Sequence, residues 1–95
     1  MNTITFQIRF LYRGTNYTAE AIRYSNHFNE VYYMVQELRP FRRMESNVFS
    51  IDKYEKRFEF TGGYSPLKLA IAHAIEKACI ERNLSCFEIE EHTIF

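Results

Sequence analysis

The segment around Pro40 holds the residues best suited to chemistry with a polyanion. Arginine can pair a phosphate through two hydrogen bonds, and a neighbouring aromatic ring can stack on a base. Acidic residues are interleaved just after the segment, and the twelve basic residues of the chain are balanced by twelve acidic ones. Dedicated nucleic-acid binders carry a stronger basic footprint. Nucleic-acid binding is therefore the alternative function, and it would use Arg39, Phe41, Arg42 and Arg43.

The cysteines and two of the histidines raise the possibility of a zinc site. Two His and two Cys can fill a tetrahedral site, but His73, Cys79, Cys86 and His92 include no closely spaced pair. On a helix, His73 and Cys79 would point roughly 120° apart. A Cys–His nucleophile pair would also lack a third group to orient the histidine. We expect no metal, no cofactor and no catalytic residue.

The turn Thr61–Ser65 leads into a helix and contains Gly62-Gly63. Free N–H groups at a helix N-terminus favour anions. The turn nevertheless lacks the lysine of a P-loop and the glycine spacing of a dinucleotide site. We interpret it as a simple strand-to-helix connection.

Composition predicts one small folded domain over residues 1–95. Seven Tyr and nine Phe, with only three Gly and two Pro, argue against disorder. No apolar run is long enough to span a bilayer, and the first twelve residues alternate where a signal peptide would be continuously apolar. Two cysteines without an export signal predict reduced thiols, a cytoplasmic location and no membrane partner.

Residues 65–83 have the features of one long helix, about 66–83. Ser65 is a good N-cap, Pro66 suits the first helical position, and Asn83 tolerates the left-handed conformation of a helix end. The inward stripe comprises Leu67, Ile71, Ala74, Ile75 and Ala78. Leu69, Ala72 and Ile80 are predicted to point to the other side.

Strands are predicted over 3–12, 17–24, 30–38 and 54–61, because polar and apolar residues alternate there. The first three form an antiparallel meander, with Gly14 and Asn16 in its first turn. Residues 47–51 and 85–91 are optional short strands. The predicted class is α+β, a sheet of four to five antiparallel strands with the helix on one face. The inward residues are Tyr17, Ala19 and Ala21 on the second strand, Val31, Tyr33 and Val35 on the third, and Phe58 and Phe60 on the fourth.

The outward face of this meander is not cleanly polar. Apolar and aromatic residues recur there, although a one-sided sheet usually presents polar residues to water. Contiguous apolar surface of this kind indicates a second covering layer or a self-association surface. We therefore predict a small cytosolic, non-enzymatic domain that binds another protein or a second copy of itself. The candidate interface residues are Ile22, Tyr24, Tyr32, Met34, Leu69 and Ile80.

Overall fold

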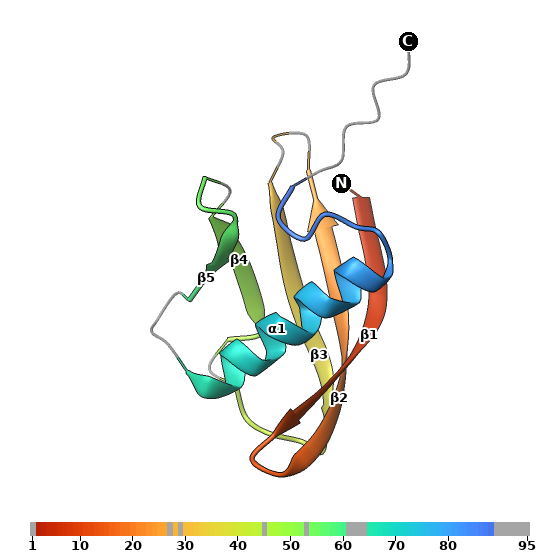
Figure 1. Cartoon of the computed structure of the whole chain (residues 1–95), viewed down its shortest axis with the longest axis vertical. Helices are drawn as coiled ribbons and strands as arrows, with labels where there is room; N and C mark the ends of the chain where they lie inside the picture. The colour runs from red at the N-terminus through yellow and green to blue at the C-terminus, as the bar shows by residue number, and fades with distance from the viewer. Residues whose placement is uncertain are drawn as a thin grey trace.

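The computed structural model describes residues 2–26, 28, 30–44, 46–52, 54–60 and 65–88. The chain forms β1 (Asn2–Tyr12), β2 (Thr15–Ser25), β3 (Val31–Arg39), β4 (Val48–Asp52), β5 (Arg57–Glu59) and α1 (Pro66–Glu81). The five strands make one antiparallel sheet in the order β1-β2-β3-β4-β5. Helix α1 crosses one face of that sheet diagonally (Figure 1). The α+β class predicted from the sequence is confirmed.

The β1–β2 hairpin turns on two residues. Tyr12 pairs with Thr15, so the turn consists of Arg13 and Gly14, with φ of 48° and 75°. Two consecutive residues with positive φ are what a tight hairpin turn needs to match the strand twist. The predicted turn role of Asn16 is wrong, because Asn16 pairs with Leu11 inside the ladder.

The optional strand at residues 47–51 forms in the structure as β4. Its strand residues pair with β3 on one side and β5 on the other. Strand β5 is shorter than the predicted 54–61, because the Asp52 carboxylate accepts the backbone N–H groups of Tyr54 and Glu55 at 3.0 and 3.1 Å. That turn, completed by Lys56 with φ of 54°, uses residues that were predicted to extend the strand. Residue 61 lies outside the described residues.

Helix α1 begins and ends as its terminal residues predict. The Ser65 hydroxyl accepts the N–H of Lys68 at 3.1 Å. At the other end Asn83 has φ of 55°, its N–H bonds to the carbonyl of Ile80, and the N–H of Leu84 bonds to the carbonyl of Cys79 at 2.9 Å. This is the Schellman arrangement, which reverses the chain direction after a helix.

The core lies between the inner sheet face and α1. All five residues of the predicted helical stripe are buried, as are Tyr17, Ala19, Ala21, Val31, Tyr33, Val35 and Phe58. Phe60 is only partly buried. The buried stripe of α1 is wider than predicted. Ala72 was expected to point outward but is 2% exposed, and Cys79 is inaccessible. Cys86 and Phe87 pack against the core and widen the covered part of the helix.

Candidate functional site

The sheet face turned away from α1 carries a contiguous apolar cluster, which we call the outer patch. In the register, Ile22 lies beside Met34, and Met34 lies beside Val48. The rings of Tyr24 and Tyr32 pair across the same strands and stack with centroids 4.9 Å apart and planes 9° apart. The outer patch is therefore Ile22, Tyr24, Tyr32, Met34 and Val48.

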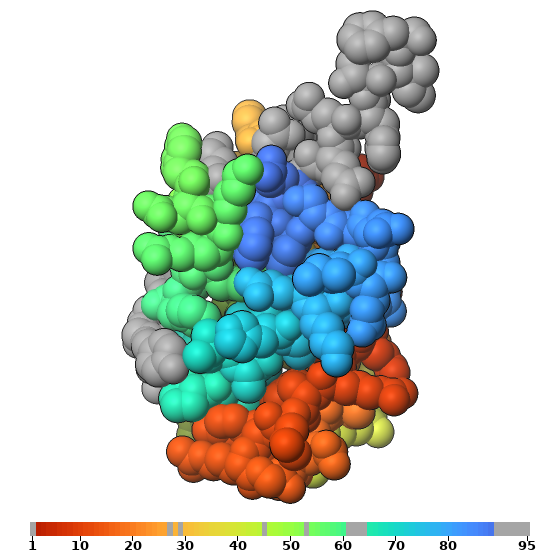
Figure 2. Space-filling model, in the orientation of Figure 1, coloured from red at the N-terminus to blue at the C-terminus, as the bar shows by residue number. Residues whose placement is uncertain are grey.

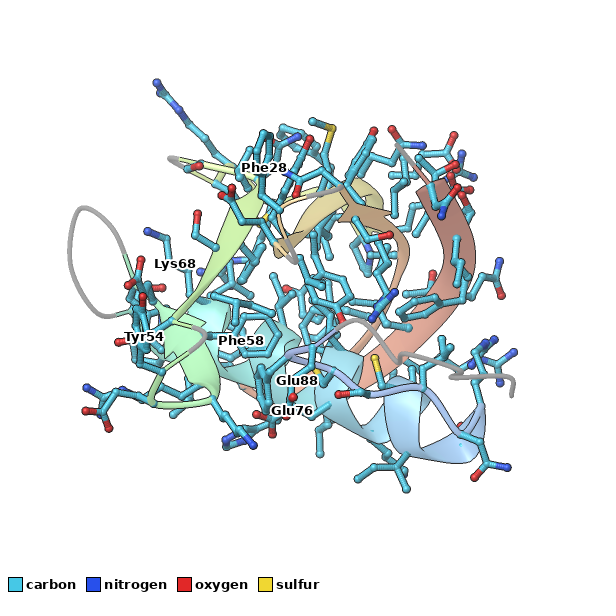
Figure 3. All side chains as sticks on the ribbon, turned by 90° about the horizontal axis from the view of Figure 1, so that it is seen from above. Phe28, Tyr54, Phe58, Lys68, Glu76 and Glu88 are labelled. Carbon is cyan, nitrogen blue, oxygen red and sulfur yellow. The ribbon has the colours of Figure 1, made fainter. Side chains whose placement is uncertain are left out.

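No described element covers the outer patch. Figure 3 looks across the sheet from above, with α1 on one side and outward side chains on the other. The four predicted members are each half-buried by their neighbours, and Val48 is 44% exposed. The structure thus brings Ile22, Tyr24, Tyr32 and Met34 together as predicted. Val48 was missed because residues 47–51 were only an optional strand. The alternation of inward and outward residues along that strand is the signal that would have placed Val48 on the outer face.

Polar residues border the outer patch along the strand direction. On one side Gln36 Nε2 donates to Glu20 Oε1 at 2.7 Å, and beyond this pair lie Arg9 and Arg39. Across the strands, Tyr32 pairs with Ser50 and Ser50 pairs with Glu59, so Glu59 lies to the side of the patch, next to the Asp52–Arg57 pair. The border of the patch therefore carries charges of both signs.

Leu69 and Ile80 lie on the opposite side of the molecule from the outer patch. They project from α1, where Ile80 is 75% exposed and Leu69 is half-buried. They are eleven positions apart, about 16 Å along a helix. The predicted interface residues therefore form two separate surfaces.

Residues 39–43, at and after the end of β3, do not form one surface, because Arg42 packs against side chains of β1 and β2. The Arg42 guanidinium lies 5.1 Å from the centre of the Tyr12 ring. Its pKa is raised, chiefly by a hydrogen bond with the side chain of Tyr17. Phe41 is 85% exposed and Arg43 is also exposed. Arg39 borders a different depression from the one that Phe41, Arg42 and Arg43 line. The four residues do not converge on a single site.

Two polar side chains of the inner sheet face hold the segment that follows α1. Arg23, only 6% exposed, donates from one guanidinium nitrogen to the carbonyls of Ser85 at 2.9 Å and Glu88 at 2.8 Å. Its cross-strand neighbour Tyr33 donates to the carbonyl of Cys86 at 2.7 Å. We call residues 84–88, so held, the clip segment. Figure 2 shows it in deep blue, lying between the green β4–β5 end of the sheet and α1.

The clip segment corrects the optional strand over 85–91. Residues 86–88 form bends and Ser85 is irregular, because the carbonyls of Ser85, Cys86 and Glu88 bond to side chains of the sheet where a ladder would use backbone N–H groups. Residues 89–91 lie outside the described residues. Alternation along β2 places Arg23 on the inner face with Ala21 and Ser25. This alternation is the sequence signal that Arg23 is buried and needs a hydrogen-bond partner.

Cys86 of the clip segment lies beside Cys79 of α1. Tyr33 Oη lies 3.4 Å from Cys79 Sγ and 3.6 Å from Cys86 Sγ. Both thiols are free. Of the other two residues considered for zinc, His73 is exposed and His92 lies outside the described residues. Among the residues that the structure describes, no group of three or more His, Cys, Asp or Glu could hold a metal ion.

Mutual contact and burial change the acidity of these groups. The pKa of Cys79 is lowered to about 7, first by the hydrogen bond with Cys86, while burial opposes this and Tyr33, Arg23 and Arg82 assist it. The pKa of Cys86 is raised by its contact with Cys79 and by burial. Burial also raises the pKa of Tyr33, so its hydroxyl stays a donor. The pair therefore releases one proton readily and resists losing a second.

No helix within the described part of the chain is both long and apolar enough to cross a membrane. No protein-family model matches the chain, and neither a curated protein nor a solved structure shows significant similarity to it.

Proposed function

We propose that the protein is a small, non-enzymatic interaction domain of the cytoplasm whose partner is a second copy of itself. The observation that supports this is the outer patch, an apolar sheet face that no described element covers. Burying apolar surface contributes about 25 cal/mol per Å² removed from water. The same sheet face of a second copy can cover it, because two sheets pack face to face.

The strand register of the outer patch defines one self-complementary arrangement. In a twofold dimer the same patch occurs on both sides of the interface. An axis lying in the interface and perpendicular to the strands would reverse the strand direction of the second copy. With Met34 near the axis, the row of Tyr24 and Tyr32 in one copy would then face the row of Glu20 and Gln36 in the other. Two stacked aromatic rings within the patch fit the composition of interface cores.

Replacing Met34 by Lys is expected to abolish dimerisation. The substitution would bring two like charges together in a desolvated interface, which costs several kcal/mol. We expect the dissociation constant to rise by about 100-fold or more. Size-exclusion chromatography with light scattering at high micromolar concentration should give twice the 11.4 kDa chain mass for the natural protein and the single mass for Met34→Lys.

The matched control is Ile80→Lys, which places the same charge on the exposed side of α1. It should leave the dimer intact. A strictly monomeric natural protein would refute self-association. A dimer lost on Ile80→Lys but kept on Met34→Lys would assign the interface to the helix and contradict the proposal.

Nucleic-acid binding is the second candidate function, and the exposure of Phe41 beside Arg43 favours it. Base–aromatic stacking is worth about 1–3 kcal/mol. If this function holds, fluorescence anisotropy with short single-stranded RNA or DNA at low salt should show binding that Phe41→Ala weakens by at least fivefold. Phe28→Ala is the control, because Phe28, in the β2–β3 turn, is also mostly exposed, at 72%. No binding at low salt would end this candidate.

A further inference from the structure

The end of α1 explains how the two cysteines come together. Cys79 lies in the last turn of the helix, and its carbonyl accepts the N–H groups of both Arg82 and Leu84. The Schellman reversal at Asn83 turns the chain back along the helix. Three residues later Cys86 lies beside Cys79, and the two side chains form a hydrogen bond. A separation of seven residues thus becomes a local contact.

Tyr33 fixes the position of this pair. Its hydroxyl contacts both sulfurs and also donates to the carbonyl of Cys86. Cys79 is held rigidly in the helix and is fully buried, whereas Cys86 is partly exposed and lies in bends. Cys86 can therefore complete the approach of the two sulfurs to the bonding distance of about 2.05 Å without disturbing α1.

We propose that Cys79 and Cys86 are a peroxide-sensitive modification site, which closes to an intramolecular disulfide and fixes the clip segment on the sheet. One sulfur of the pair, as the thiolate, attacks a peroxide oxygen; the O–O bond breaks, hydroxide leaves, and a sulfenic acid forms. The other thiol then displaces water from that sulfenic sulfur, and the S–S bond forms. With hydrogen peroxide, two thiols and one peroxide give one disulfide and two waters.

The acidity of the pair supports the first step. A thiolate is the nucleophile in this chemistry, and the lowered pKa of Cys79 supplies one near neutral pH. The partly exposed flank of Cys86 gives a small oxidant its approach to the pair.

The disulfide would strengthen a contact that otherwise depends on a few polar interactions. Arg23 and Tyr33 hold the clip segment by hydrogen bonds to its carbonyls. The ion pair of Lys56 with Glu88, 2.9 Å long, is mostly exposed and adds little. A covalent link to α1 would stop the segment from lifting while the sheet and helix stay folded.

Hydrogen peroxide titration of the full chain, followed by alkylation under denaturing conditions and mass spectrometry, tests the proposal. We expect the chain mass to fall by two hydrogens, neither cysteine to be alkylated, and one peptide to contain linked Cys79 and Cys86. Cys79→Ser and Cys86→Ser should each gain oxygen on the remaining sulfur and form no intramolecular link. Two alkylated cysteines after oxidation, or only a disulfide between chains, would overturn the proposal.

Amide hydrogen exchange tests whether the disulfide fixes the clip segment, because a disulfide without that effect would leave the exchange rates unchanged. Oxidation should slow exchange of the amides of residues 86–88 by at least tenfold, and reduction should restore it. A disulfide that forms without slowing these amides would refute the claim that it fixes the clip segment.

Discussion

Replacing Ile71 by Ala is expected to lower the free energy of unfolding by about 3 kcal/mol, because it opens a cavity at the centre of the core. The Ile71 side chain is completely inaccessible and lies on the stripe of α1 that faces the sheet. Neighbouring side chains such as Ile75 and Ile8 are also inaccessible. They have little freedom to collapse into the space left behind. Urea denaturation followed by far-UV circular dichroism measures the change.

Ile80→Ala is the matched control for this prediction. It makes the same chemical change on the same helix, at a side chain that is 75% exposed. We expect its effect to remain within about 0.5 kcal/mol. Equal effects at the two positions would mean that α1 does not pack on the sheet through the Ile71 face.

Arg23→Ala is expected to cost a similar amount, about 3 kcal/mol, for a different reason. Hydrogen bonds from a charged donor contribute about 1.5–3 kcal/mol, and the buried stem of the arginine adds packing. The substitution removes the donor shared by the carbonyls of Ser85 and Glu88. Part of the loss is offset, because Arg23 Nε is buried and has no partner among the described residues. Urea denaturation again gives the change in stability.

The clip segment distinguishes this loss from a general weakening of the fold. Arg23→Ala should accelerate amide exchange at residues 86–88 more than in the helix stripe. Arg9→Ala, the control, removes an exposed arginine from the outer face of β1. It should change neither the free energy of unfolding nor the amide exchange of residues 86–88. A clip segment that exchanges normally in Arg23→Ala would show that the guanidinium does not hold it.

The sequence predicted those parts of the fold that depend on local periodicity. Alternation along β2 and β3 identified the inner face, including Ala19 and Tyr33, because a strand places every second side chain on one side. The ends of α1 were predictable because Ser65 and Asn83 act within one turn of the helix. The optional strand at residues 85–88 was wrong because the partners of its carbonyls, Arg23 and Tyr33, lie more than fifty positions earlier.

The candidate sites likewise include parts that local sequence predicts and parts that depend on contacts distant in the chain. Four members of the outer patch were predictable, since their grouping needs only the strand period and a hairpin register. The separation of Leu69 and Ile80 from that patch depends on which face of the sheet the helix covers. The division of residues 39–43 arises because the Tyr12 ring and the Tyr17 side chain hold Arg42. Neither contact could be predicted from the residues near Arg42 in the sequence.

Isotope-filtered nuclear Overhauser spectroscopy on a mixture of labelled and unlabelled chains tests the outer patch most directly. Self-association through this face predicts intermolecular signals between the rings of Tyr24 or Tyr32 and the methyl groups of Ile22, Met34 or Val48 in the other chain. A dimeric sample in which these signals are absent, and in which Leu69 or Ile80 shows intermolecular contacts in their place, would contradict it.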